Sequence, residues 1–144
     1  MAHTNPSDDT LRTLLANART IAVVGASGNP EKASYDIMRR LQRAGYRVVP
    51  VNPRETEILG ELVYPSLADI PDPVDIVTVF RRSEYTPAIA GEAAAIGAKA
   101  LWLQSGIAND EAATLAMAGG LVAVMDACIA TMHAFLRIPA IPAR

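Results

Sequence analysis

The sequence contains a single cysteine, Cys128, among its 144 residues. One cysteine excludes a disulfide within the chain and a cluster of thiolates around a metal ion. Histidine is nearly as scarce, with two residues, and there is no His-x-x-x-His pair and no grouping of carboxylates at metal-ligand spacing. The sequence therefore predicts no metal site.

An excess of charge of one sign is also lacking, because 13 Lys and Arg stand against 15 Asp and Glu, for a formal net charge of -2. This balance excludes a surface that binds nucleic acid through a general positive field. No apolar run approaches the roughly 18–20 residues of a membrane span. Residues 1–9 lack the charged start and the apolar segment of a signal peptide. We therefore expect a cytoplasmic chain that binds neither nucleic acid nor membrane.

Aromatic residues make up only 5% of the chain, although 51% of it is hydrophobic. The excess consists of Ala, Val, Ile and Leu, which suits close packing of helices on a sheet. The length fits one domain of roughly 100–150 residues, and no repeat or linker divides it. We expect a single domain over residues 1–144, with a flexible tail at residues 1–7 and an irregular end at residues 139–144.

Short apolar runs alternate along the chain with segments of helical spacing. Strands of about five residues that alternate with helices of about ten residues indicate βαβ units and a parallel sheet. Right-handed crossovers then give a doubly wound, Rossmann-like α/β fold with helices on both faces. Pro50 favours an edge position for its strand, and Ser7 is a candidate helix cap. We expect strands at residues 21–24, 47–51, 62–64, 75–80, 100–103 and 121–125, and helices at 8–18, 35–44, 87–96, 110–118 and 129–136.

In such folds ligands bind beyond the carboxyl ends of the strands, and the loop after the first strand starts at Gly25. Gly25 and Gly28 permit unusual backbone conformations, and the small Ala26 and Ser27 let a ligand approach the main chain. Free amides and the Ser27 hydroxyl can bind phosphate oxygens, with Lys32 as a nearby cation. The loop matches neither the dinucleotide nor the triphosphate fingerprint. It predicts a phosphate site, and the alternative is a plain turn.

The second strand ends at Val51-Asn52-Pro53-Arg54, where a domain that binds NAD carries an acid for the ribose hydroxyls. Arg54 instead suits a ribose that bears a phosphate, as in NADP or coenzyme A (CoA). In the alternative interpretation, Asn52 forms a local turn and Arg54 is a solvated surface charge.

Three more strand ends carry polar or reactive side chains. Phe80 and Arg81 can stack on a purine or meet a phosphate, or they can serve as a core residue and a surface charge. Gln104 begins a loop that can contact the far portion of a ligand or simply turn. Cys128 and His133 are five residues apart, which does not place them on one helical face, and no third orienting group is evident. We therefore assign no catalytic residue.

Taken together, these segments resemble the small bacterial CoA-binding proteins. Their single domain is similar to the CoA-binding domain of succinyl-CoA synthetase alpha subunits and of NDP-forming acyl-CoA synthetases. The resemblance covers roughly residues 20–136. Its carriers are Val23-Val24-Gly25-Ala26-Ser27 with Lys32 and Ser34-Tyr35, Val51-Asn52-Pro53-Arg54, Ile58-Leu59-Gly60, Val63-Tyr64-Pro65-Ser66-Leu67, Val79-Phe80-Arg81-Arg82-Ser83, Trp102-Leu103-Gln104, and Val124-Met125-Asp126 with Cys128.

The resemblance implies a bound CoA with its pyrophosphate at Gly25 to Ser27 and with Lys32 near phosphate. The adenosine end would lie between Asn52-Pro53-Arg54 and Phe80-Arg81. The candidate cofactor-binding residues are Gly25, Ala26, Ser27, Lys32, Ser34, Tyr35, Asn52, Pro53, Arg54, Phe80, Arg81 and Gln104.

One departure from the family pattern lies in the last segment. Family members usually carry Met-Asp-Arg-Cys-Ile-Lys followed shortly by Glu-His, and this chain has Ala127, Ala130 and Met132 in place of three charges. A thioester-end, partner or regulatory role that depends on those charges is therefore not supported. The leading hypothesis is non-catalytic binding of CoA or an acyl-CoA. The alternatives are an NADP-binding, oxidoreductase-like protein and a ligand-sensing subunit of a protein partner.

Overall fold

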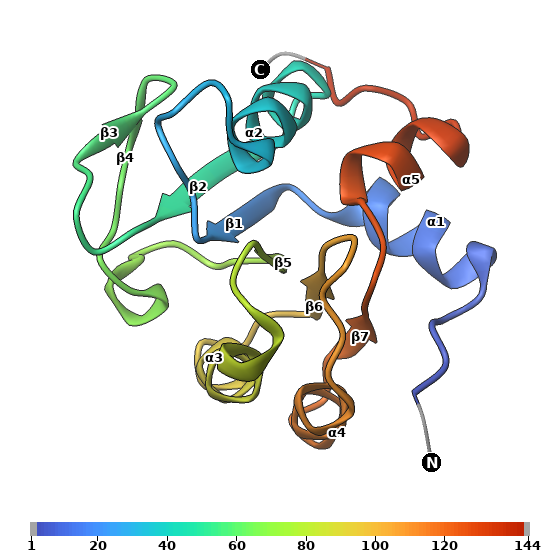
Figure 1. Cartoon of the computed structure of the whole chain (residues 1–144). Helices are drawn as coiled ribbons and strands as arrows, with labels where there is room; N and C mark the ends of the chain where they lie inside the picture. Colours follow the sequence, from blue (N-terminus) through green and yellow to red (C-terminus); the bar gives the residue numbers. More distant parts are fainter. Residues whose placement is uncertain (1–2, 143–144) are drawn as a thin grey trace.

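Five short apolar runs form one parallel sheet in the computed structural model, which describes residues 3–142 (Figure 1). The strand order is β2-β1-β5-β6-β7, and every neighbouring pair is parallel. Helices cover both faces, so the strands are apolar on both sides. The predicted α/β, Rossmann-like fold is confirmed. The strands are β1 (Thr20–Val24), β2 (Arg47–Val51), β5 (Ile76–Val79), β6 (Ala100–Leu103) and β7 (Val122–Val124).

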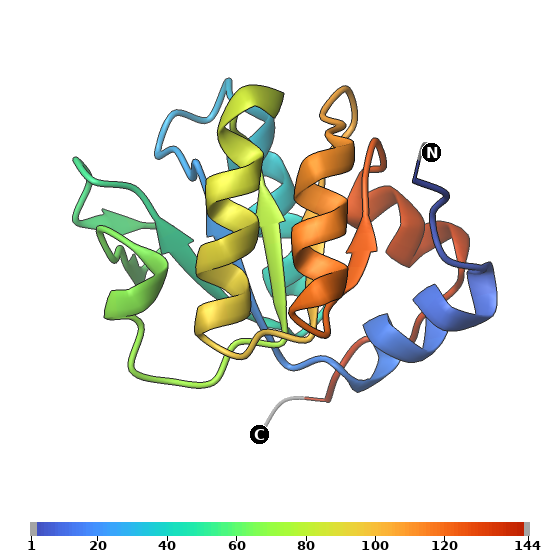
Figure 2. The ribbon, with the colours of Figure 1, turned by 90° about the horizontal axis from the view of Figure 1, so that it is seen from below.

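Two layers of helices enclose the sheet. Helices α3 (Thr86–Ala95) and α4 (Asp110–Ala118) lie side by side on one face (Figure 2). Their contact is close because it is made of small residues, and a Cβ added at Gly119 would lie 2.6 Å from Ala94 Cβ. Within residues 3–142, no helix combines the length and apolarity that crossing a membrane requires.

The opposite face carries α1 (Asp8–Asn17), α2 (Ala33–Arg43) and α5 (Ile129–Phe135) (Figure 1). Buried side chains of these three helices pack against the sheet in one apolar cluster. The Ser7 side chain accepts a hydrogen bond from the backbone N–H of Thr10, which confirms the predicted cap.

Strand β2 is the first strand in the order and therefore lies at an edge of the sheet, as predicted from Pro50. The Pro50 carbonyl accepts from the Tyr64 N–H at 3.1 Å, on the side where proline has no donor of its own. Tyr64 adds an isolated parallel bridge to Val51. The strand expected at residues 62–64 is thus not a strand of the main sheet, and this bridge is what it contributes there.

Leu62 instead belongs to a small hairpin, β3 (Glu57–Ile58) with β4 (Glu61–Leu62). Its two turn residues, Leu59 and Gly60, both have positive φ, +51° and +79°. Two-residue hairpin turns of this kind need positive φ at both positions, which explains the glycine. Strand β3 was not predicted from the sequence.

Strand order reverses between β1 and β5, because the chain goes from β1 to β2 on one side and then returns to β5 on the other. In open α/β sheets such a point is where ligands bind. The loops after the two strands come close there. Gly25 has φ +84°, and a Cβ at this position would lie 2.7 Å from the Phe80 carbonyl oxygen. Glycine is required both by the conformation and by the close approach.

His3 and Asn5 form hydrogen bonds with residues in and just after β7, whereas a flexible tail was predicted for residues 1–7. The Asn5 amide donates to Met125 O at 2.8 Å and accepts from Met125 N–H at 2.9 Å. His3 Nε2 lies 2.8 Å from Ala123 O. The Asn5 side chain thus pairs with the residue that follows the edge strand, as a neighbouring backbone would. Residues 139–142 are irregular, as expected, and residues 1–2 and 143–144 lie outside the described part of the chain.

Candidate functional site

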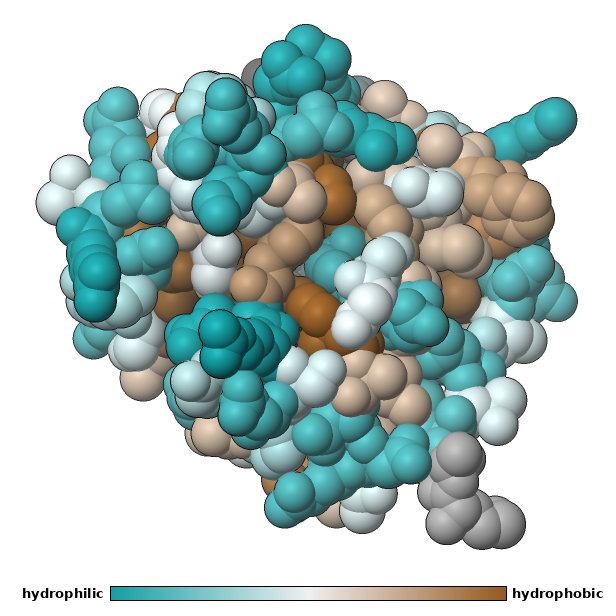
Figure 3. All heavy atoms as spheres, in the orientation of Figure 1, coloured by the Kyte–Doolittle hydropathy of each residue, from teal (hydrophilic) through white to brown (hydrophobic). Residues whose placement is uncertain are grey.

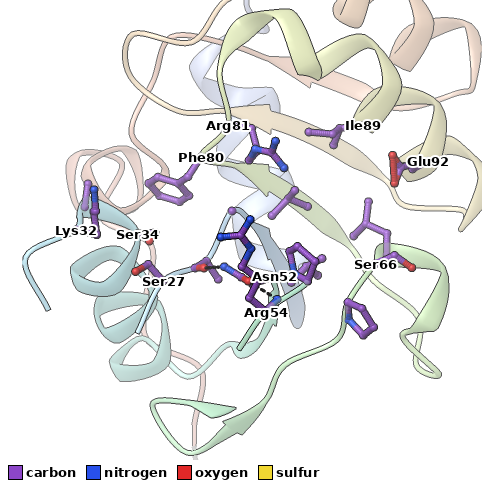
Figure 4. Close-up of a pocket in the computed structure, with 18 residues that line it drawn as sticks. Ser27, Lys32, Ser34, Asn52, Arg54, Ser66, Phe80, Arg81, Ile89 and Glu92 are labelled. Atoms are coloured by element: carbon purple, nitrogen blue, oxygen red, sulfur yellow. Dashed lines mark hydrogen bonds between the residues drawn. The ribbon is translucent and has the colours of Figure 1, made fainter. Parts of the chain in front are cut away.

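A groove with a volume of about 730 Å³ opens where the strand order reverses (Figure 4). Its size falls within the roughly 300–1,000 Å³ of small-molecule sites. On this face, hydrophilic residues surround apolar ones (Figure 3). Ten of the twelve predicted residues line the groove: Gly25, Ala26, Ser27, Lys32, Ser34, Asn52, Pro53, Arg54, Phe80 and Arg81.

The first turn of α2 forms one end of the groove, through Lys32, Ala33 and Ser34. Lys32 is the N-cap residue, and no side chain caps this helix. The N-terminus of a helix carries uncapped N–H groups and partial positive charge, which together attract anions. Ser27 Oγ also lines the groove while it accepts from Asn29 N–H at 3.1 Å, so that its own hydrogen remains available for a ligand.

The glycine amides of the preceding loop are engaged within the protein. The N–H groups of Gly25 and Ala26 lie 3.1 and 3.3 Å from Val51 O. The Gly28 N–H is shared between the two carboxylate oxygens of Glu55, at 3.0 and 3.1 Å. The N–H groups of Gly25, Ala26 and Gly28 are therefore not the free amides that the sequence suggested. Groups suited to bind phosphate lie instead at Ser27 and at the start of α2.

The Asn52 side chain organises the loop after β2. Its Oδ1 accepts from Arg54 N–H at 2.8 Å and from Glu55 N–H at 3.3 Å, which is the local turn named as an alternative. Its Nδ2 donates to Ala26 O at 2.8 Å. Both ends of the amide are thus used within the protein. Asn52 shapes the groove and holds the loop that brings Arg54 into it.

Three cations and one carboxylate line the groove: Lys32, Arg54, Arg81 and Glu92. Arg54 and Arg81 lie in its middle, between Lys32 and Glu92 (Figure 4). Arg81 Cζ stands 4.7 Å from the centre of the Tyr85 ring, a cation–π contact that orients the guanidinium. The groove is therefore net positive and suits a ligand with several negative charges.

Phe80 lines the groove and also packs against the apolar cluster beneath α2. The structure does not bring Tyr35 and Gln104 to the groove. Tyr35 packs against the same cluster. Gln104 is buried, and it donates to Thr78 Oγ1 and accepts from Ile129 N–H at 3.3 Å. Its amide joins β5, β6 and α5.

Eight groove residues were absent from the predicted set. Three of them, Val24, Ala33 and Val51, adjoin predicted residues in the sequence, and the other five are Pro65, Ser66, Leu67, Ile89 and Glu92. Residues 65–67 follow the bridge between Tyr64 and Val51, which carries them beside the carboxyl end of β2. Ile89 and Glu92 are three residues apart on α3, so they share a face of that helix. This spacing could have indicated from the sequence that Ile89 and Glu92 lie together. Whether their face points into the groove depends on how α3 packs.

Cys128 and His133 lie on the helical layer of α1, α2 and α5 and do not line the groove. The ring of His133 meets the Tyr46 ring edge-on, with centroids 5.7 Å apart. Its Nε2 is buried without a hydrogen-bond partner, and burial lowers the pKa of His133. Among residues 3–142, no three His, Cys, Asp or Glu side chains converge as metal ligands would.

The sequence matches the CoA binding domain family over residues 19–134. It is 41% identical over 130 residues to the uncharacterized protein YneT of Bacillus subtilis, a match that covers 90% of this chain and 96% of that protein. It is also 34% identical over 95 residues to the ADP-forming acetate–CoA ligase II of Archaeoglobus fulgidus. That match covers 64% of this chain and only 14% of the ligase.

Solved structures of the same fold also include both a small protein and a larger synthetase. A hypothetical protein from Pyrococcus horikoshii superposes with a TM-score of 0.89 at 37% identity, over 95% of this chain and 99% of that one. The apo dinucleotide-forming acetyl-coenzyme A synthetase 1 of Candidatus Korarchaeum cryptofilum gives a TM-score of 0.67 at 28% identity, over 76% of this chain and 26% of the synthetase. As the sequence resemblance implied, the chain belongs to the CoA-binding domain family, which includes both small proteins and segments of larger synthetases.

Proposed function

We propose that the chain binds CoA or an acyl-CoA in the groove and does not itself catalyse a reaction. The observation that carries this proposal is the combination of an uncapped helix N-terminus with three cations around one groove where the strand order reverses. CoA carries a pyrophosphate and a 3′-phosphate, and the groove offers positive charge at two separate places, which matches that distribution.

The pyrophosphate would lie at Ser27 and the start of α2, with Lys32 as the counter-charge. The adenosine end would lie between Asn52-Pro53-Arg54 and Phe80-Arg81, with Arg54 at the 3′-phosphate. A guanidinium is the side chain best suited to a terminal phosphate because it can donate two parallel hydrogen bonds.

A binding role without catalysis is supported by the chemistry of the lining residues. Among the described residues that line the groove, no His or Cys occurs, and Glu92 is the only carboxylate. The serine hydroxyls that line the groove therefore have no histidine among the lining residues to act as their base. The synthetase and ligase relatives are several times longer than the matched segment, so their chemistry has parts outside it.

Arg54 is equally compatible with the 2′-phosphate of NADP, and an acid at the end of β2 is absent, so an NADP-binding, oxidoreductase-like protein is the second candidate. Mass spectrometry of small molecules released from the purified protein distinguishes CoA from NADP directly. If CoA binding also controls the capture of a protein partner, the chain would act as a ligand-sensing subunit.

Isothermal titration of ligand-free protein with CoA, acetyl-CoA and NADP tests the proposal. We expect CoA to bind, and Lys32→Ala and Arg54→Ala each to weaken binding about tenfold, since each removes a charge-assisted hydrogen bond. Arg12→Ala is the control, because Arg12 pairs with Asp9 on α1, away from the groove. A folded protein that fails to bind CoA would refute the proposal.

A further inference from the structure

The end of the groove farthest from Lys32 presents hydrogen-bond acceptors from two different elements (Figure 4). Glu92 projects from α3, and an ionised carboxylate can only accept hydrogen bonds. The Ser66 hydroxyl donates its single hydrogen to Asp69 Oδ2 at 2.8 Å, so only its lone pairs remain for a ligand. A ligand group that binds here must therefore be a hydrogen-bond donor.

The walls beside these acceptors are apolar. Leu67 and Ile89 line this part of the groove and are 2% and 6% exposed. Ile89 lies one turn before Glu92 on α3, so the carboxylate stands next to an apolar surface. A phosphate would be repelled by the carboxylate and would lose its hydration against these side chains. A flat, uncharged ring with a donor at its edge fits both requirements.

We propose that Glu92 and Ser66 are specificity-determining residues that select a purine with an exocyclic amine, namely adenine. The inference rests on the proposed function, because the base belongs to the bound CoA. The amine N–H groups donate to the Glu92 carboxylate and to Ser66 Oγ. A purine with a carbonyl oxygen at the same position turns a lone pair toward these acceptors and loses both hydrogen bonds. The same arrangement orients the ligand, with its pyrophosphate toward Lys32.

The test compares CoA with deamino-CoA, in which a carbonyl oxygen replaces the amine of the base. Titrations are made with the unmodified protein, with Glu92→Gln and Ser66→Ala, and with Glu111→Gln as the control. Glu111 lies in the first turn of α4, is exposed and does not line the groove, so its substitution changes the net charge equally. All four proteins are first shown to melt cooperatively, which is expected because Glu92 and Glu111 are both exposed.

We expect the unmodified protein and Glu111→Gln to prefer CoA about tenfold, the worth of a hydrogen bond to a charged group. Glu92→Gln should reduce the preference to about twofold, because an amide can also donate to the carbonyl oxygen. Ser66→Ala should reduce it by a smaller factor. If CoA binds and the preference is unchanged in Glu92→Gln and Ser66→Ala, the assignment of the base is wrong and the proposed function stands. If the folded protein binds neither compound, the proposed function fails and this inference fails with it.

Discussion

The Asn52 side chain connects the loops that follow β1 and β2, since its Nδ2 donates to the Ala26 carbonyl oxygen at 2.8 Å. The other end of the same amide holds the turn that leads to Arg54. Together with the Glu55 carboxylate, which accepts from the Gly28 N–H, this side chain holds two walls of the groove at a fixed distance. Affinity for a ligand and stability of the fold should depend on it together.

Replacing Asn52 with alanine should lower the free energy of unfolding by about 1–3 kcal/mol, because half-buried polar groups of the backbone lose their partners. CoA affinity should fall as well, since Arg54 is no longer held. Urea unfolding and titration calorimetry measure the two effects. Asn29→Ala is the control, because Asn29 forms a similar turn with Glu31 N–H at an exposed place. Equal effects of the two substitutions would contradict the connecting role of Asn52.

Replacing Gly25 with alanine should cost more stability than replacing Gly120. Both glycines have nearly the same positive φ, +84° and +86°, so each substitution carries about 1–2 kcal/mol of backbone strain. At Gly25 the new Cβ would also meet the Phe80 carbonyl oxygen at 2.7 Å, whereas nothing lies within 4 Å at Gly120. The difference between the two unfolding free energies isolates the clash. Gly25→Ala should also weaken CoA binding, and Gly120→Ala should not.

Much of the sheet could be predicted from the sequence because each strand is covered on both faces. An apolar run such as β6 (Ala100–Leu103) then marks a strand whatever its neighbours are. Pro50 alone likewise predicted an edge position for β2, because a residue without an N–H donor is tolerated on the outer side of an edge strand. The loops that line the groove were located for the same local reason, since they follow directly from the ends of these runs.

Features that depend on contacts between distant residues could not be predicted. Gln104 follows a strand, as a ligand-binding residue would, but its buried partners Thr78 and Ile129 come from other elements. The β3–β4 hairpin has two residues in each strand and turns at Leu59, a residue that rarely adopts positive φ. Glu92 occurs in an alanine-rich helix, and only the packing of α3 turns it toward the groove.

His133 should make stability depend on pH. Burial lowers the pKa of His133 below its ordinary value of 6.5, and its buried Nε2 has no partner. The unfolded chain therefore takes up a proton as pH falls through about 6.5 while the folded chain does not, so the free energy of unfolding decreases with decreasing pH.

Thermal or urea unfolding between pH 8 and pH 5 measures this dependence. His133→Phe keeps an aromatic ring beside Tyr46 and removes the titration, so its decrease in stability below pH 6.5 should be smaller. Above pH 7.5 the two proteins should show parallel curves, since the imidazole is then neutral in both states. If the curves of the two proteins are parallel below pH 6.5 as well, His133 does not contribute to the pH dependence of stability.

Arg81 and Arg82 offer the sharpest test of where the phosphates lie, because adjacent arginines have different surroundings. Arg81 lines the groove and stacks on Tyr85, whereas Arg82 is outside it, with a side chain 80% exposed and 3.7 Å from Glu84. Arg81→Ala should weaken CoA binding about tenfold, and Arg82→Ala by less than about twofold. Both should leave the unfolding free energy within about 0.5 kcal/mol of the original value.

Raising the salt concentration should reduce the CoA affinity of the Arg81→Ala protein less steeply than that of the unmodified protein, since one phosphate contact is gone. Equal losses from the two substitutions would mean that the ligand is attracted by the general charge of this surface and is not held in the groove.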